Sequence, residues 1–199
     1  MILVLIKTII VSDLQRHSTD YLRNKFLPLL KFSIHLMEPL QLIPYTPNDF
    51  AIFYSLVKED AVMRYVSGQG LTEEQAQEKF ASILEVNAQD PMLGYFKIYN
   101  TTGAYLGDGK MEWNKRDRTQ LEIGYILKES YWGKGYGTQI CSELLALAAR
   151  TYPTTSIIGI IDPANIASKK LLEKFGFKSY FIGIEDGLPT EKLILIKGN

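Results

Sequence analysis

The sequence predicts a mixed α/β (α+β) fold in a single domain with about four helices. Three observations support this prediction. Short apolar or alternating segments mark strands, capped segments with apolar residues every three or four positions mark helices, and the two kinds are interleaved. Their order is strand, two helices, three strands, helix, strand, helix and two strands. A chain of 199 residues is long enough for one such domain with a substantial core.

Residues 1–36 precede the predicted domain. Residues 1–11 are almost wholly apolar, but the stretch is too short to span a bilayer as a helix and lacks the features of a secretory signal. Met37 stands just before the first predicted strand, residues 38–44. We therefore expect residues 1–36 to be an N-terminal extension of unknown role, and residues 37–199 to form the domain.

Two helices are expected next in the chain. The first begins with Thr46 as N-cap and Pro47 as the first helical residue. The second begins at Thr72, where Gln75 completes a capping box. The loop between them, residues 63–70, carries glycines and an aromatic residue. It is either a plain connector or the lining of a binding site.

Strands and further helices make up the rest of the chain. The expected strands cover 93–99, 104–113, 120–127, 156–161, 177–184 and 191–197. Gly124, inside the third of these, indicates a bulge or a close approach by a ligand. A helix with Cys141 on its apolar face follows the glycine-rich stretch at 133–137, and Asp162 and Pro163 are expected to open the last helix, which ends at Gly176. Residues 185–190 read as a hairpin loop.

Composition narrows the classes of partner. The chain has 22 basic and 22 acidic residues, so it has no general attraction for nucleic acid or for an anionic membrane. Its one cysteine excludes an internal disulfide and fits a reducing, cytoplasmic setting. Two histidines and one cysteine stand far apart without zinc-ligand spacing, so we expect no metal.

The most informative stretch is Tyr131-Trp132-Gly133-Lys134-Gly135-Tyr136-Gly137-Thr138, between a predicted strand and a predicted helix. Three glycines in alternate positions leave main-chain N–H groups uncovered, and a helix N-terminus adds unpaired N–H groups with a positive dipole end. Together with the charge of Lys134, these features favour an anion site, most naturally for phosphate. The alternative is a plain glycine-rich turn with a solvated lysine.

A second pattern lies one strand later. Asn165 is followed three residues on by Ser168, and then by Glu173-Lys174-Phe175-Gly176-Phe177. The pairing of this pattern with the glycine loop resembles the GNAT superfamily of acyl-CoA-dependent N-acyltransferases. It is most similar to the branch that contains the ribosomal-protein N-terminal acetyltransferases, because Glu122-Ile123-Gly124-Tyr125 runs into the glycine loop in the same way. The resemblance covers about residues 38–197. It implies a mostly antiparallel sheet that is splayed at the fourth strand.

The resemblance implies acetyl-CoA as cosubstrate and no metal. The N–H groups of Gly133, Lys134, Gly135, Tyr136, Gly137 and Thr138 would hold the coenzyme diphosphate. The strand end formed by Tyr125, Ile126 and Leu127 would pair its main chain with the pantetheine arm, and an N–H group there would polarise the thioester carbonyl. Asn165 would bond the coenzyme arm or brace the neighbouring strand, and Ser168 would lie near the sulfur.

The chain departs from the family pattern at two positions. Trp132 stands where the glycine loop usually begins with Gln or Arg, which removes one side-chain contact but not the main-chain cradle. Leu172 stands where many members have a tyrosine that protonates the leaving thiolate. Ser168 is then the nearest hydroxyl, unless it only bonds back to the helix backbone.

Transfer of an acyl group to an amine requires a neutral amine, and thus a base or a water leading to one. Glu122 is the predicted base, because it shares a strand face with Gly124 beside the expected cleft. The alternative for Glu122 is a solvent-facing strand carboxylate. Glu112 and Glu185 are the reserve candidates.

Other nucleotide sites fit poorly, because the glycine order is wrong for a P-loop and Ile140 replaces the third glycine of a dinucleotide fold. A non-catalytic acyl-CoA sensor is the remaining rival. The expected acceptor is a primary amine, either a protein N-terminus or a small molecule such as an amino acid, polyamine or aminoglycoside. A homodimer is common in such families, and the sequence does not determine it.

Overall fold

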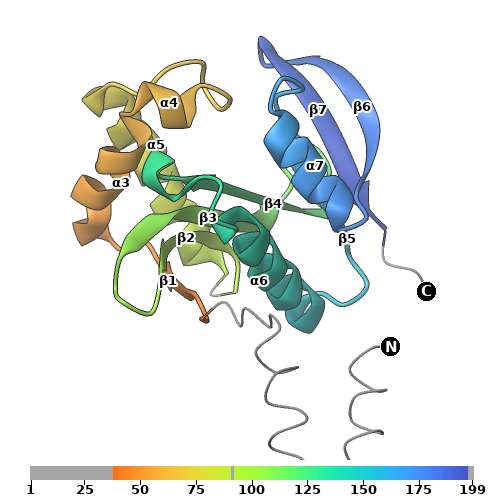
Figure 1. The fold of residues 1–199 in the computed structure, drawn as a ribbon, viewed down its shortest axis with the longest axis horizontal. Coiled ribbons are helices and arrows are strands. Elements are labelled where there is room, and N and C mark those ends of the chain that lie inside the picture. Colours follow the sequence, from red (N-terminus) through yellow and green to blue (C-terminus); the bar gives the residue numbers. More distant parts are fainter. Residues whose placement is uncertain (1–37, 91, 197–199) are drawn as a thin grey trace, which may run out of the picture. The chain divides into compact units, whose positions relative to one another are not determined.

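The computed structural model describes residues 38–90 and 92–196, and the expected extension at 1–36 lies outside them. Within the described residues a seven-stranded sheet carries five α-helices (Figure 1). The strands are β1 (Gln41–Pro44), β2 (Gly94–Tyr99), β3 (Tyr105–Trp113), β4 (Gln120–Leu127), β5 (Ser156–Ile161), β6 (Lys178–Glu185) and β7 (Leu188–Leu195). The helices are α3 (Phe50–Val57), α4 (Asp60–Met63), α5 (Glu73–Gln89), α6 (Tyr136–Thr151) and α7 (Ile166–Lys174), with short 3-10 turns at Pro47–Asp49 and Glu129–Tyr131.

The strand order across the sheet is β1-β2-β3-β4-β5-β7-β6. All neighbouring strands are antiparallel except β4 and β5, which run parallel. A parallel pair needs a crossover, and α6 supplies it. The predicted mixed, mostly antiparallel architecture is therefore confirmed.

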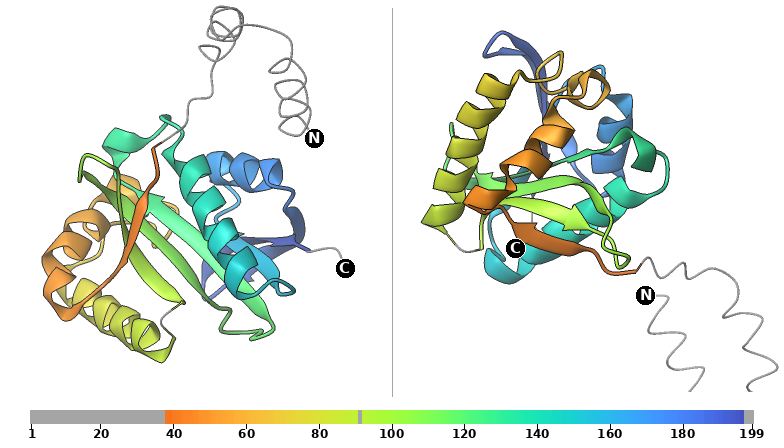
Figure 2. Two further views of the ribbon diagram at one scale, coloured as in Figure 1. Left: turned by 90° about the horizontal axis from the view of Figure 1, so that it is seen from below. Right: turned by 90° about the vertical axis from the view of Figure 1, so that its left-hand side faces the viewer.

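The helices cover opposite faces of the sheet (Figure 2). On one face, α6 packs against β3 and β4 around Ile140, Leu144 and Met111, all fully buried. On the other face, α3 and α5 enclose a second core that includes Phe53, Phe80 and other buried apolar residues. The buried side chains thus form two separate clusters, with the sheet between them.

The pairing of β4 with β5 stops before either strand ends. It runs from Gln120 opposite Ser156 to Ile123 opposite Gly159, whereas β4 continues to Leu127 and β5 to Ile161. The last four residues of β4 therefore have no strand on their β5 edge. This is the splay at the fourth strand that the family resemblance implies.

The two predicted helix starts are confirmed. Thr46 and Asp49 form a capping box ahead of α3, and Thr72 and Gln75 form another ahead of α5. Between these helices the chain also forms the four-residue helix α4, which the sequence analysis did not anticipate. A single helical turn is too short to show a period in the sequence.

Two predicted boundaries are wrong. Helix α7 has its N-cap at Asn165, because Asp162 instead accepts a hydrogen bond from the Ala164 N–H (2.7 Å) and forms a separate turn. The hairpin between β6 and β7 is not a long loop but a two-residue turn at Asp186 and Gly187, which both have positive φ (50° and 79°). A two-residue Asp-Gly turn matches the twist of the two strands that it joins. The hairpin therefore needs no longer loop, and β7 starts at Leu188, earlier than expected.

Candidate active site

The glycine loop joins β4 to α6, and each glycine has its own structural reason. Gly133 and Gly135 lie in the left-handed region (φ +70° and +86°), where a side chain is strained, and Gly135 is the N-cap of α6. At Gly137 a Cβ would lie 2.7 Å from the hydroxyl oxygen of Tyr125. The loop therefore needs two glycines for its path and one for close packing against β4.

This loop leaves a row of donors without acceptors. Among the described residues, the N–H groups of residues 133–138 donate to no protein acceptor, and the first hydrogen bond of the helix is Gln139 N–H to the Gly135 carbonyl (3.2 Å). The Lys134 ammonium lies 5.8 Å from the centre of the Tyr131 ring, at the same loop. These unpaired donors at the positive end of a 16-residue helix have the form of an anion cradle.

Trp132, the departure from the family pattern, holds the loop to the strand. Its indole N–H donates to the Leu127 carbonyl (2.9 Å), at the end of β4. Its side chain thus fixes the path of the loop, and it leaves the cradle N–H groups uncovered.

The open edge of β4 presents main-chain groups toward the gap. Lys128 N–H donates to the Leu106 carbonyl and Asn114 N–H to the Gln120 carbonyl (2.9 Å each), so the even-numbered residues of β4 bond β3. Because main-chain groups alternate along a strand, Tyr125 and Leu127 direct theirs toward β5, which has already diverged. The Leu127 carbonyl accepts the Trp132 indole N–H, so the groups that this edge leaves for an extended ligand are the N–H and carbonyl of Tyr125 and the N–H of Leu127.

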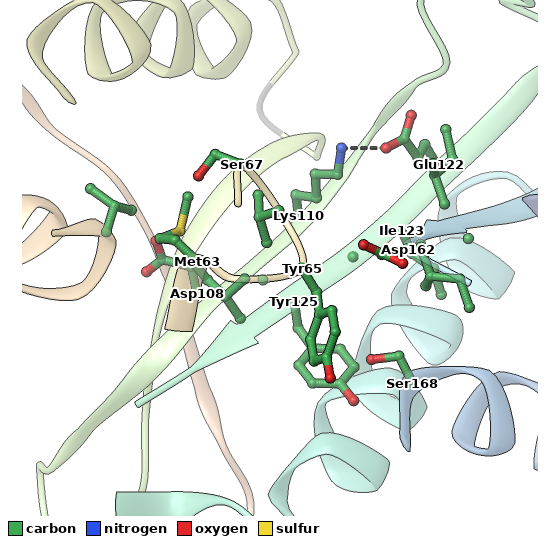
Figure 3. A pocket seen from close by; sticks show the side chains of 18 of the residues that line it. Met63, Tyr65, Ser67, Asp108, Lys110, Glu122, Ile123, Tyr125, Asp162 and Ser168 are labelled. Carbon is green, nitrogen blue, oxygen red and sulfur yellow. Dashed lines mark hydrogen bonds and ion pairs between the residues drawn. The ribbon is translucent and has the colours of Figure 1, made fainter. Parts of the chain in front are cut away.

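A cavity of about 700 Å³ occupies the gap between the strands (Figure 3). Its lining comes from both cores. One part, which we call the α6 side, is formed by Cys141, Leu144, Ile161, Ser168 and Leu172; the other, the α3 side, is formed by Phe53, Val57, Met63, Leu71 and Tyr95. Residues 63–68 of the loop after α4 also line it, so this loop is part of the pocket and not only a connector.

Gly124 borders this cavity, and the structure settles why it is a glycine. The β3–β4 register is continuous across it, with Gly124 opposite Lys110, so the expected bulge is absent. A Cβ at this position would lie 3.1 Å from the Cε atom of Lys110. The glycine thus makes room for the lysine side chain that crosses it.

Glu122 lies on the α3 side and is only 9% exposed, so it is not a solvent-facing carboxylate. It forms an ion pair with Lys110 (Figure 3). It also accepts a hydrogen bond from Asn114 Nδ2 (3.0 Å). Lys110 also bonds Glu112 Oε1 (3.0 Å), which accepts from the Tyr95 hydroxyl (2.8 Å). The structure therefore brings Glu122 and the reserve candidate Glu112 together around one ammonium group.

Charge compensation in this cluster shifts two pKa values. Burial alone would lower the pKa of the Lys110 ammonium, but the charges of Glu122 and Glu112 beside it raise that pKa above its usual value. Burial alone would raise the pKa of Glu112, but Lys110 and the Tyr95 hydroxyl hold it below its usual value. The second reserve, Glu185, lies apart from the cluster and pairs with Lys192 (2.7 Å).

Asp108 is a carboxyl group of the cavity that the sequence analysis missed. It is 5% exposed and accepts hydrogen bonds from the hydroxyls of Tyr45 (2.5 Å) and Tyr105 (2.6 Å). Burial raises the pKa of Asp108 to about 7, although both hydroxyls oppose the shift. A signal was available, because Asp108 alternates with Lys110 and Glu112 on one face of its strand.

On the α6 side, Tyr125 and Ser168 lie close together (Figure 3). Burial raises the pKa of the Tyr125 phenol, and a hydrogen bond with Ser168 works against that shift. Asn165 accepts the Ser168 main-chain N–H at its Oδ1 atom (3.1 Å), so its side chain caps α7. Cys141 is 1% exposed, as expected for a core thiol, and burial raises its pKa to about 12.

Residues 38–90 and 92–196 contain no group of three or more His, Cys, Asp or Glu side chains arranged to hold a metal. The same part of the chain has no helix long and apolar enough to cross a bilayer.

Comparison with known proteins agrees with this geometry. A family model described as an acetyltransferase (GNAT) domain matches residues 40–178. The chain belongs to the GNAT acetyltransferase family. Among curated proteins, the uncharacterized N-acetyltransferase YnaD of Bacillus subtilis (strain 168) is 24% identical over 142 residues, which is 66% of this chain and 74% of that protein.

Solved structures share the GNAT fold. The aminoglycoside acetyltransferase AAC(6')-Ib, solved with paromomycin and acetyl-CoA, superposes with a TM-score of 0.68 at 19% identity, over 80% of this chain and 94% of that one. The ribosomal L7/L12 α-N-protein acetyltransferase RimL, solved with coenzyme A, has a TM-score of 0.66 at 16% identity, over 79% and 94%. A GNAT acetyltransferase from Bacillus anthracis gives 0.63 at 17%, over 79% and 93%. At these identities the likeness concerns the fold alone.

Proposed function

We propose that the protein is an N-acetyltransferase that moves an acetyl group from acetyl-CoA directly to a primary amine. The observation that carries the proposal is the parting of β4 from β5 after Ile123 and Gly159, directly beside a glycine loop with unpaired N–H groups. The parting gives an extended arm a strand edge to pair with, and the loop gives a diphosphate its donors. Acetyl-CoA has both parts.

The residues present fit the coenzyme. Gly133, Lys134, Gly135, Tyr136, Gly137 and Thr138 would hold the diphosphate through their N–H groups. Tyr125 and Leu127 would pair with the pantetheine arm and leave one N–H group for the thioester carbonyl, where it would stabilise negative charge. Ile126 lies on the same strand end and would contribute to coenzyme binding there. Asn165 would support the α6 side of the cavity, because its side chain caps the start of α7.

Glu122 would accept the proton that the amine must lose. It lies in the cavity, on the face of β4 next to Gly124, with its charge balanced by Lys110. Asp108 is the alternative base, since burial places its pKa at about 7, near the working pH of a general base. Ser168 is the proposed donor to the leaving thiolate, in contact with the Tyr125 phenol that lies next to it.

A non-catalytic acyl-CoA sensor is the second candidate. The ion pair between Glu122 and Lys110 favours it, because a carboxylate held by an ammonium group is not free to take a proton directly. A sensor would bind the coenzyme and release no thiol. The two functions therefore differ in one measurable quantity, the release of thiol from acetyl-CoA.

The test is a thiol-release assay with acetyl-CoA and a panel of amino acids, peptides, polyamines and aminoglycosides, run beside calorimetric titration with coenzyme A. Thiol release that depends on an amine supports the transferase. Tight coenzyme binding without release with any amine would leave the sensor, and no binding would contradict both.

Three further properties follow as proposals. We place the catalytic domain at residues 37–199, supported by the family match to residues 40–178. The single cysteine supports a cytoplasmic setting. The motif around Glu122 and the glycine loop supports a branch close to the ribosomal-protein acetyltransferases, although the acceptor, a protein N-terminus or a small molecule, is a separate question.

A further inference from the structure

Asp162 is a carboxylate of the cavity that the proposed transfer does not use. It follows β5 directly, beyond Gly159, the last residue of that strand that pairs with β4. Figure 3 shows its side chain among those that line the cavity, between Glu122 and Ser168 in this view. Asp162 therefore lies on the β5 side of the strand gap, across from the open edge of β4.

The carboxylates that line the cavity differ in how their charge is compensated. Glu122 pairs with Lys110, and Asp108 accepts hydrogen bonds from two tyrosine hydroxyls. Asp162 accepts the main-chain N–H of Ala164 at its Oδ1 atom (2.7 Å) and forms no ion pair with any residue of 38–90 and 92–196. Its Oδ2 atom is therefore available to a ligand. A partly buried carboxylate of this kind favours a cationic partner.

The cavity is also lined by two cations, which come from its other side. Lys79 belongs to α5 and Arg64 to the loop after α4, whereas Asp162 stands between β5 and α7 (Figure 1). The Lys79 ammonium lies 5.6 Å from the centre of the Tyr95 ring, and the Arg64 guanidinium 4.7 Å from the centre of the Tyr65 ring. Neither cation forms an ion pair with Asp162, so neither replaces a ligand there.

The chemistry of the transfer separates the roles of the two carboxylates. The amine that attacks the thioester must be neutral, and Glu122 is the group proposed to take its proton. A carboxylate without a counter-charge stabilises the charged form of an amine, so Asp162 suits a group that keeps its proton throughout. Apolar side chains, such as Val57, Met63 and Leu71, line the same cavity and suit a chain of methylene groups.

We propose that the acceptor carries two amino groups joined by an aliphatic chain, and that Asp162 binds one of them as an ammonium group while the other is acetylated. In the transfer the C–N bond forms and the C–S bond breaks. The sulfur keeps the electron pair and takes a proton through Ser168, and the proton of the attacking amine goes to Glu122. The proposal rests on the proposed function and deepens it by naming the acceptor class. Asp162 contacts the acceptor and not the reacting atoms, so it is a specificity-determining residue.

The test compares butane-1,4-diamine with butylamine as acceptors in the thiol-release assay. We expect kcat/KM for the diamine to exceed that for butylamine at least tenfold, since a charge-assisted hydrogen bond gives about this factor. The diamine also has two equivalent amines, one of which is less basic while the other is charged. This part of the preference does not depend on Asp162, and a variant separates it. Equal values, or a preference for butylamine, would overturn the proposal and leave the transferase intact.

Asp162→Asn assigns the preference to the residue. Asparagine retains the oxygen that accepts the Ala164 N–H, so the variant removes the charge and keeps the turn. The preference for the diamine should fall about tenfold through KM, with kcat and coenzyme affinity unchanged. Asp117→Asn is the matched control, because Asp117 likewise accepts the N–H two residues on, that of Thr119 (2.9 Å), and does not line the cavity. A preference that survives Asp162→Asn in full would contradict the assignment.

Binding gives a second readout that does not need turnover. Calorimetric titration of butane-1,4-diamine into protein saturated with coenzyme A should show binding that weakens about tenfold in Asp162→Asn and not in Asp117→Asn. If no amine releases thiol, the proposed function fails, yet this titration still decides whether Asp162 binds the diamine. Absence of diamine binding to the wild-type protein would overturn the proposal.

Discussion

In the proposed transferase, the two sides of the cavity would recognise their ligands by different means. On the α6 side, the proposed binding groups are main-chain N–H groups, placed by Gly133, Gly135 and the end of β4. On the α3 side they are side chains, drawn from the loop after α4, from α5, and from strands β2 to β4.

This difference explains why the family is easy to assign and the acceptor is not. Main-chain recognition depends on the positions of glycines and strand ends, which can be recognised in the sequence. Side-chain recognition depends on which residues meet in space. Glu122, for example, pairs with Lys110 of the neighbouring strand, and Lys110 lies against the Tyr95 ring together with Lys79. No local sequence pattern predicts these contacts.

The largest expected effect tests the proton acceptor on the α3 side. Glu122→Gln should lower kcat about a hundredfold, because the amine loses its base, while coenzyme binding stays within about twofold. The measurement is thiol release at saturating acetyl-CoA, with calorimetry for the coenzyme. Glu85→Gln, an exposed carboxylate on α5, is the control.

Asp108→Asn belongs in the same experiment. If it abolishes turnover while Glu122→Gln does not, the base is Asp108 and the role of Glu122 is to hold Lys110.

A second prediction tests main-chain recognition on the α6 side. Gly133→Ala places a residue with a side chain at a backbone φ of +70°, which should lower the free energy of unfolding by about 1–2 kcal/mol. Because this strain shifts the loop, the variant should also bind the coenzyme about tenfold more weakly. Gly103→Ala is a matched control, because Gly103 has φ +78° in the turn between β2 and β3 and is likewise free of neighbours within 4 Å. Both variants should lose similar stability, measured by thermal unfolding. Equal coenzyme affinity in both would contradict the cradle.

A third prediction uses the raised pKa of Asp108 on the α3 side. Its pKa is about 7 in the folded protein, whereas an exposed aspartate has a pKa of 3.8, so between these pH values the folded state binds more protons than the unfolded state. Stability from this group is complete below pH 4 and is lost as the pH rises to 7, by up to about 4 kcal/mol. Urea unfolding of the wild type and Asp108→Asn should show a difference that changes with pH in this direction. A difference that does not change with pH would show that folding does not raise the pKa of Asp108.

The smallest expected effect is that of replacing Trp132, whose side chain holds the glycine loop to the end of β4. Trp132→Phe removes the hydrogen bond to the Leu127 carbonyl and should cost about 1 kcal/mol of stability, with a loss of coenzyme affinity smaller than that of Gly133→Ala. Trp113→Phe, at a ring that packs against Tyr152, should leave coenzyme affinity unchanged. A coenzyme affinity that falls more in Trp132→Phe than in Gly133→Ala would mean that this side chain binds the coenzyme itself.

Much of the fold could be predicted from sequence because its signals are local. The N-cap at Thr46, the capping box at Thr72 and the bounds of β4 and β5 agree with the structure, since short-range hydrogen bonds and strand periodicity determine them. The start of α7 was missed because Asp162 and Asn165 can both cap a helix, and their competing turn geometry decides between them.

The candidate site divides in the same way. The glycine loop follows from its residues, whereas Asp108 was missed because its importance comes from Tyr45, which lies 63 positions away in the chain. The partner of Glu122 was missed for the same reason. Contacts between distant segments depend on strand register, and a single sequence does not reveal register.

The open edge of β4 has a fixed length. It extends from Gly124 to Leu127, which at the rise of an extended chain is about 13 Å. In the proposed complex the glycine loop would fix one end of the arm, so the length of this edge would determine how far along the strand the acyl carbon lies. A donor with a shorter or longer arm would be held equally well by its diphosphate and would place its acyl carbon away from Glu122.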